Sequence, residues 1–220
     1  MDDGEPRSCI DCGTKGCGGK GGRRPGFCLT DRVPDGMLEE SLSHYGDGLE
    51  GRIMRVAATV EHDGYLRWCR VQETMEFAKR MGFRKIGIAN CLGLLEEART
   101  LAGILRSNGF EVFGASCKTG MVPKTDVGID PECCEIGPNI CNPVLQAEIL
   151  NSHGTELNIL VGLCVGHDSL FYMNSKAPVT TLVVKDRVLA NNPAGALYAA
   201  GSFYKGLNGC IDRGDDAGKR

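Results

Sequence analysis

Four cysteines lie close together at the start of the chain: Cys9, Cys12, Cys17 and Cys28. Their spacing is C-x2-C-x4-C-x10-C, in a stretch rich in glycine and poor in apolar side chains. Such a stretch cannot offset its ordering entropy by burial, whereas a metal bound by thiolates contributes folding free energy directly. The spacing therefore predicts a metal module over residues 1–30, holding zinc or an iron–sulfur cluster. The alternative is a floppy tail with incidental thiols.

A second set of four cysteines is spread through the rest of the chain: Cys91, Cys117, Cys141 and Cys164. Cys91, Cys117 and Cys164 are each predicted to end a strand, and Cys141 precedes the helix start Asn142-Pro143. Because the carboxyl ends of parallel strands share one edge of a sheet, the four thiols are predicted to converge there. Four thiolates suit a zinc ion or an iron–sulfur cluster, and we favour a 4Fe–4S cluster. If only three ligate, one iron stays open to substrate. The alternative is that these cysteines only fill the core.

Other polar residues accompany this edge. His167 and Asp168 follow Cys164 within four residues and are candidates for an acid/base and its orienting group. The alternative is that Asp168 caps a short helix and His167 is a surface residue. Lys185-Asp186-Arg187, after the last strand, is either a charged lid or anion contact, or a solvated turn. Cys133 and Cys134 lie in a long loop, and the sequence does not decide whether one of them is a spare or alternative ligand.

Alternating patterns predict the elements that position these residues. Strands are predicted over 85–91, 110–117, 157–164 and 179–185, and helices over 37–45, 49–61, 66–81, 94–105, 142–150, 167–173 and 194–204. Strands alternating with helices indicate a Rossmann-like or flavodoxin-like parallel sheet of about four strands, with helices on both faces. The predicted organisation is a metal module (1–30), a helical connector (31–65), the α/β domain (66–207) and a disordered tail (208–220). The strand order is not readable from the pattern.

The composition of the chain limits the partners and the cellular location that we expect. The chain has 220 residues, a formal net charge of −3 and 42% hydrophobic residues. The near-neutral charge argues against nucleic acid as a partner, and no apolar run reaches the ~20 residues that span a bilayer. Twelve cysteines without a signal peptide indicate reduced thiols and a cytoplasmic location. The expected partners are a redox protein or a small-molecule substrate, and the sequence says nothing of the oligomeric state.

Several segments resemble a known family. They are W-x-R-V-x-E (68–73), E-F-A-K-R-M-G (76–82), C-L-G-L (91–94), C-K-T-G (117–120), C-N-P-V-x-Q-A (141–147) and G-L-C-V-G-H-D-S-L-F (162–171), with the blocks K-A-P-V-T-T-L-V-V-K-D-R-V-L and N-P-A-G-A-L-Y behind them. Together they are similar to an uncharacterised, cysteine-rich metal-binding family of anaerobic archaea and bacteria, the domain of unknown function 1847. The resemblance implies an N-terminal zinc site at Cys9, Cys12, Cys17 and Cys28. It also implies family cysteines at Cys91, Cys117, Cys141 and Cys164, and it implies no reaction.

The residues leave three functions open, and they do not decide whether the protein is an enzyme. The leading hypothesis is a cytoplasmic metalloprotein with an N-terminal four-cysteine site and a core iron–sulfur cluster that serves redox or sulfur chemistry. The second is a zinc-stabilised module that binds a small molecule or a protein without catalysis. The third is a cluster-free thiol oxidoreductase. The core has no C-x-x-C at a helix start, and this counts against the third hypothesis.

Overall fold

The computed structural model describes residues 7–19 and 21–209, and the chain divides into two compact units between His62 and Asp63. Most of the predicted tail, residues 210–220, lies outside the described residues. In the described residues no helix is both long and apolar enough to cross a bilayer.

The first unit has almost no core of its own. It begins with three short 3-10 turns, Cys9–Asp11, Gly16–Gly18 and Leu29–Asp31, followed by helix α1 (Met37–Ser43) and helix α2 (Leu49–Gly64). None of the described residues up to position 50 is buried. Apolar burial therefore contributes little to holding the cysteine-bearing turns in place.

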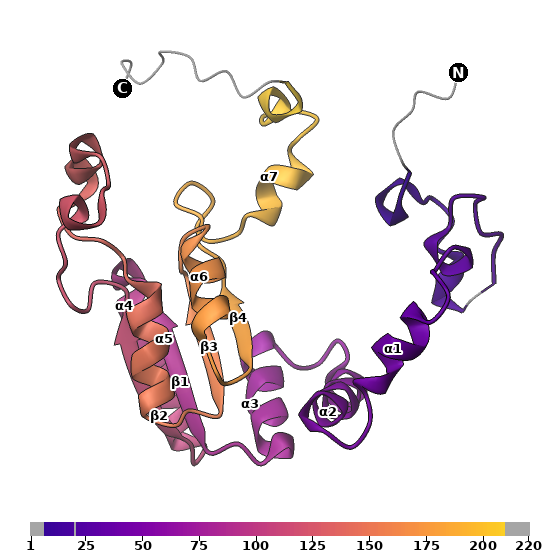
Figure 1. The fold of residues 1–220 in the computed structure, drawn as a ribbon, viewed down its shortest axis with the longest axis horizontal. Coiled ribbons are helices and arrows are strands. Elements are labelled where there is room, and N and C mark those ends of the chain that lie inside the picture. Colours follow the sequence, from indigo (N-terminus) through magenta and orange to yellow (C-terminus); the bar gives the residue numbers. More distant parts are fainter. Residues whose placement is uncertain (1–6, 20, 210–220) are drawn as a thin grey trace. The chain divides into compact units, whose positions relative to one another are not determined.

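The second unit is built on one parallel sheet of four strands, β1 (Lys85–Asn90), β2 (Glu111–Ser116), β3 (Leu157–Val161) and β4 (Val179–Val183). Their order is β2-β1-β3-β4 (Figure 1). The prediction of an α/β fold with four parallel strands is confirmed, and the order matches the first four places of a flavodoxin-like sheet. The order reverses between β1 and β3, the point at which such sheets bind ligands.

Helices cover both faces of this sheet. Helices α3 (Arg70–Met81) and α4 (Leu95–Ser107) pack on one face, and α5 (Pro143–Ser152) and α6 (His167–Asn174) cover the other (Figure 1). The central strands β1 and β3 read as almost continuous apolar runs, because both of their faces are buried. The edge strands β2 and β4 are more exposed.

Short-range signals place most element ends. Gly82 ends α3 with φ 74°, a left-handed conformation that suits glycine, and the Asn142 side chain accepts the Leu145 N–H at 3.0 Å to begin α5. Most predicted helix bounds differ from the observed ones by a few residues, and two of them differ most. Helix α3 begins at Arg70 rather than 66, because Leu66 has φ 56° and interrupts the pattern. The last helix, α7 (Ala194–Tyr198), is followed by turns instead of reaching 204.

The predicted strand over 157–164 was also too long. Strand β3 ends at Val161, because Gly162 turns the chain out of the sheet with φ 68°. Cys164 therefore lies three residues beyond its strand, whereas Cys91 and Cys117 directly follow β1 and β2. The expectation that all three cysteines occupy equivalent last positions of strands is corrected to this staggered arrangement.

Candidate metal centre

Backbone hydrogen bonds fix the cysteine-bearing segments to the carboxyl end of the sheet. The Cys91 N–H donates to the Val161 carbonyl at 3.0 Å, and the Cys117 N–H donates to the Asn90 carbonyl at 2.9 Å. The Asn142 N–H donates to the Cys117 carbonyl at 2.8 Å, which brings Cys141 beside Cys117. These contacts set the backbone at three of the four core cysteines.

Gln146 joins α5 to the same strand ends. Its side chain is fully buried, and Nε2 donates to the carbonyls of Ala115 at 2.6 Å and Asn90 at 3.2 Å. Because an amide so deeply buried needs partners, these bonds favour one position of α5 over the sheet. Gln146 is thus a positioning residue for the thiols of Cys91, Cys117 and Cys141.

Three of the core thiols form one hydrogen-bonded group. The buried Cys117 thiol bonds both Cys91 and Cys141, and these bonds lower the pKa of each of those two cysteines to about 5. Lys185 adds to the effect at Cys91, and Lys118 and then His167 add to it at Cys141. The pKa of Cys117 itself is raised, first by its bond with Cys141 and then by its bond with Cys91.

Backbone amides also face these sulfurs. The Leu92 N–H donates to Cys117 Sγ at 3.3 Å, and the Gly93 N–H bonds the Cys91 thiolate. Both amides belong to the turn that leads from β1 into α4, where oriented N–H groups favour negative charge. The turn thus stabilises thiolates at the sheet edge.

The fourth thiol is held differently. Arg187 Nη2 donates to Cys164 Sγ at 3.1 Å, and this bond raises the pKa of the guanidinium. The structure thus divides the four predicted ligands into a group of three and one thiol paired with a cation.

His167 and Asp168 lie in the first turn of α6, beside this edge. Both backbone N–H groups donate to the Cys164 carbonyl, at 2.9 and 3.1 Å. His167 is close enough to Cys141 for its charge to lower the pKa of that thiol. Gly166 is the N-cap of α6, so the interpretation of Asp168 as the capping residue is wrong. The Asp168 carboxylate accepts the Ser169 N–H at 2.8 Å.

The donor set fits a thiolate-bound metal by its chemistry. Within the described residues, however, no group of three or more His, Cys, Asp and Glu side chains is already spaced to hold an ion. Thiol side chains reorient by rotation about a single bond, while the hydrogen-bonded backbone beneath them keeps its place. Ligation at this edge therefore requires at least a reorientation of the thiol side chains.

The four N-terminal cysteines line a single cavity. It measures about 320 Å³, and Cys9, Cys12, Cys17 and Cys28 are all among its lining residues. The pKa of Cys12 is lowered by a hydrogen bond from the Thr14 hydroxyl and then by the backbone amides of Thr14 and Lys15. Such N–H to sulfur bonds favour a thiolate.

The remaining described cysteines belong to other elements of the second unit. Cys133 and Cys134 belong to a 3-10 turn, Pro131–Ile136, in the loop between β2 and α5, and the Cys133 carbonyl accepts a hydrogen bond from Lys124. Cys69 is the exposed N-cap of α3. Cys210 falls outside the described residues.

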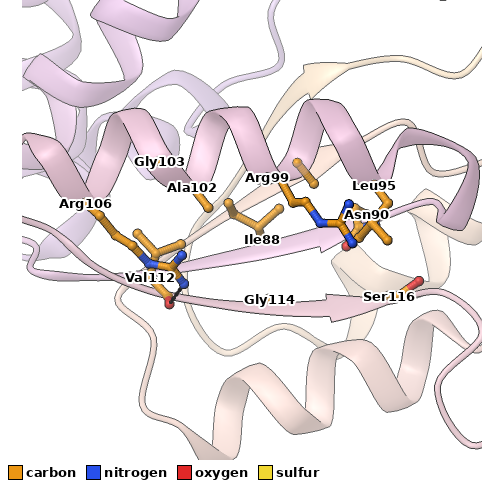
Figure 2. Close-up of a pocket in the computed structure, with 11 residues that line it drawn as sticks. Ile88, Asn90, Leu95, Arg99, Ala102, Gly103, Arg106, Val112, Gly114 and Ser116 are labelled. Carbon is orange, nitrogen blue, oxygen red and sulfur yellow. Dashed lines mark hydrogen bonds between the residues drawn. The ribbon is translucent and has the colours of Figure 1, made fainter.

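A separate cavity of about 340 Å³ lies on the α4 face of the sheet, between that helix and strands β1 and β2 (Figure 2). Its lining residues include Ala102 and Gly103 of α4 and Gly114 of β2, and the small size of these residues accounts for the empty volume. Arg106 bonds the Val112 carbonyl at one end, as Figure 2 shows. The core cysteines pack with the opposite face, so this cavity is distinct from the thiol group.

Two residues of the site were missed by sequence reasoning, Lys118 and Gln146. Lys118 directly follows Cys117, and its Nζ donates to the Asn139 carbonyl at 2.5 Å while its charge acts on Cys141. Its position next to a predicted ligand was a usable signal. Gln146 looks like an ordinary polar residue of a helix, and only the packing of α5 reveals its burial.

Comparisons with known proteins identify the family of this chain, and the function of that family is unknown. The model of the family described as "Protein of unknown function (DUF1847)" matches residues 28–182. The chain is 47% identical over 180 residues to the uncharacterized protein MJ0455 of Methanocaldococcus jannaschii, a match covering 79% of this chain and 89% of that protein.

Among solved structures, Dph2 from Pyrococcus horikoshii aligns with a TM-score of 0.35 and 21% identity, over 63% of this chain. The structure of the same protein with a 4Fe–4S cluster aligns with a TM-score of 0.35 and 20% identity, over 64% of this chain. This chain spans only about a third of the Dph2 chain, at 32% and 33% in the two cases.

Proposed function

Because the chain belongs to the DUF1847 family, whose function is unknown, we propose a function from its own cysteines: a metalloprotein with a core iron–sulfur cluster that serves redox or sulfur chemistry. Cys91, Cys117 and Cys141 would hold the cluster, a 4Fe–4S cluster in our proposal, with Cys164 beside it. The N-terminal cysteines would hold a structural zinc ion or a second cluster.

The convergence of Cys91, Cys117 and Cys141 at the carboxyl end of the sheet, which backbone hydrogen bonds fix, is the observation that carries this proposal. Thiolates are the iron ligands in such clusters, and backbone N–H bonds to sulfur tune their potential. Cys164 is hydrogen-bonded to Arg187, and if only the other three cysteines held the cluster, one iron would be open to substrate. When bound, the cluster supplies an electron carrier or a Lewis-acidic iron.

The protein's own residues supply the rest of the proposed chemistry. His167 lies beside Cys141 and is the proposed proton donor or acceptor, and Asp168 next to it is the proposed orienting group. Gln146 keeps α5 on the strand ends. Strands β1 and β3 pair with each other next to the site. The buried residues that pack there with the core cysteines limit the access of water from the side of the sheet.

Anaerobic purification tests the core proposal. We expect iron and acid-labile sulfide in the protein and an absorption band near ~400 nm, which is typical of thiolate-ligated iron. A colourless protein that contains zinc and no sulfide would overturn the cluster and favour a zinc-stabilised binding module. Metal analysis of the intact chain gives both answers in one sample.

The N-terminal site is expected to depend on its metal. Cys12→Ser should remove about one metal equivalent and make residues 7–30 sensitive to protease, because metal binding there replaces a hydrophobic core. The α/β unit should stay folded, as judged by an unchanged melting transition. Cys133→Ser, which changes a thiol outside the lined cavity, is the matched control. Unchanged metal content in Cys12→Ser would contradict the proposed site.

A further inference from the structure

The cavity between α4 and strands β1 and β2 has the size and the access of a ligand site. Its volume of about 340 Å³ is at the lower end of the ~300–1,000 Å³ that is usual for small-molecule pockets, so a ligand that fits it is small. Gly103 of α4 and Gly114 of the edge strand β2 both line the cavity, and both are exposed. A small molecule can therefore reach the cavity from solvent, between the helix and the edge strand.

Apolar side chains form much of the lining. They come from both the helix and the strands: Ile88, Leu95, Ala98, Ala102 and Val112. Ile88 and Ala98 also belong to the buried core between the sheet and α4, so this part of the lining is held in place by packing. Contact with these side chains removes apolar surface of a ligand from water, which favours binding. The ligand is therefore expected to have an apolar body.

The charges on the lining are positive. Arg99 and Arg106 of α4 line the cavity, whereas no Asp or Glu from the described part of the chain does so. Figure 2 shows the two arginines toward opposite ends, and Arg106 donates to the Val112 carbonyl at 3.1 Å. Arg99 pairs with Glu96, but both side chains are exposed, and such pairs contribute little free energy. An anion in the cavity can therefore compete for the Arg99 guanidinium.

Two polar residues of the strands lie toward the Arg99 end of the cavity, as Figure 2 shows: Asn90 of β1 and its register partner Ser116 of β2. Asn90 is 3% exposed, and its Nδ2 donates to the Cys91 carbonyl at 2.9 Å, which uses one of its two N–H groups. Ser116 Oγ is buried and has no hydrogen-bond partner among the residues that the structure describes. A buried hydroxyl without a partner costs free energy, and rotation about χ1 redirects it toward a ligand.

We infer that this cavity binds a small monocarboxylate with an apolar body. The carboxylate accepts hydrogen bonds from the Arg99 guanidinium, whose planar fork matches two carboxylate oxygens, and from the Ser116 hydroxyl. One guanidinium and neutral donors match a single negative charge. The apolar body lies against Ile88 and Val112, toward Arg106. The core cysteines pack with the opposite face of the sheet, so this inference does not depend on the proposed cluster.

Calorimetric titration of the intact, anaerobically purified protein tests the inference. The probes are hexanoate and phenylacetate. Acetate, which has the charge without the body, and hexanamide, which has the body without the charge, are the comparisons. The better of the two acids should bind at least about 10-fold more tightly than either comparison, because it alone uses both the apolar lining and Arg99. Which acid binds better identifies an aliphatic or an aromatic body.

Three variants locate the binding. Arg99→Gln should weaken the binding of the better acid at least about 10-fold, the loss expected for a charged hydrogen bond. Gly114→Val should abolish binding by filling the cavity and should still fold, because a Cβ there meets only the Ile88 carbonyl oxygen among the described atoms, at 3.7 Å, and valine suits a strand. Ser116→Ala should weaken binding about 5-fold without lowering the melting temperature, because the hydroxyl that it removes has no described partner.

Lys79→Gln is the matched control, because Lys79 forms an i,i+3 pair with Glu76 on α3 and does not line the cavity. It should bind the acids like the unmodified protein. The inference is overturned if neither acid binds more tightly than acetate, if hexanamide binds as tightly as the better acid, or if Arg99→Gln binds like the unmodified protein. Arg99 is exposed, so its variant keeps the test decisive even if Gly114→Val does not fold.

Discussion

Cys117→Ser is expected to empty the core metal centre while the α/β unit stays folded. Cys117 is the thiol that hydrogen-bonds both Cys91 and Cys141, and it is only 3% exposed. A serine hydroxyl does not ionise at neutral pH and is a poor ligand for iron, yet it still accepts the Leu92 N–H. Iron and sulfide should therefore fall to background, and the band near ~400 nm should disappear.

The matched control is Cys69→Ser, in the same unit. Cys69 is the exposed N-cap of α3, a position at which serine is favoured, so both metal content and stability should be kept. Circular dichroism shows whether Cys117→Ser is folded. A folded Cys117→Ser protein with full iron content would exclude Cys117 as a ligand.

Gly87→Ala is expected to destabilise the α/β unit strongly. A Cβ on Gly87 would lie 2.0 Å from Asn158 Oδ1 and 2.9 Å from Leu150 Cδ1, distances that no carbon occupies without movement. Asn158 is fully buried and cannot move freely, because its Oδ1 accepts the Thr155 hydroxyl and its Nδ2 donates to Ser175 Oγ, both at 2.8 Å. Overpacking plus a disrupted buried network costs about 3 kcal/mol or more.

The change is measured as a melting temperature. For a chain of this size, about 3 kcal/mol corresponds to a decrease of roughly 6–12 °C. Gly103→Ala is the matched control, because nothing lies within 4 Å of a Cβ there and the residue is inside α4. Alanine at that position should raise the stability by up to about 1 kcal/mol. Equal melting temperatures for Gly87→Ala and the unmodified protein would contradict the close packing of β1 against Asn158.

The elements themselves were predictable where the local signal is strong. The apolar runs of β1 and β3 and the caps at Gly82 and Asn142 depend on nearby residues, so their pattern is present in the sequence. The strand order was not readable, because β1 pairs with both β2 and β3 through contacts that no local pattern encodes.

Features of the site were predictable to different extents. Cysteine positions at predicted strand ends were enough to expect Cys91 and Cys117 at one edge. The pairing of Cys164 with Arg187 was not, because it depends on the turn at Gly162 and on where β4 ends. The contact between Gly87 and Asn158 could not be predicted from the sequence either, because it joins residues that are far apart in the chain.

The pairing of β1 with β3 has a consequence during synthesis on the ribosome. Cys91 is anchored to the carbonyl of Val161, so its edge of the sheet cannot close until β3 has left the exit tunnel. At the usual ~5–20 residues per second, the nascent chain spends several seconds with Cys91 and Cys117 exposed and unpaired. During that interval these thiols are open to oxidation, and a cofactor delivered early would find an incomplete set of ligands. Assembly of the core site is therefore a late event, and it favours cells or compartments that keep nascent thiols reduced.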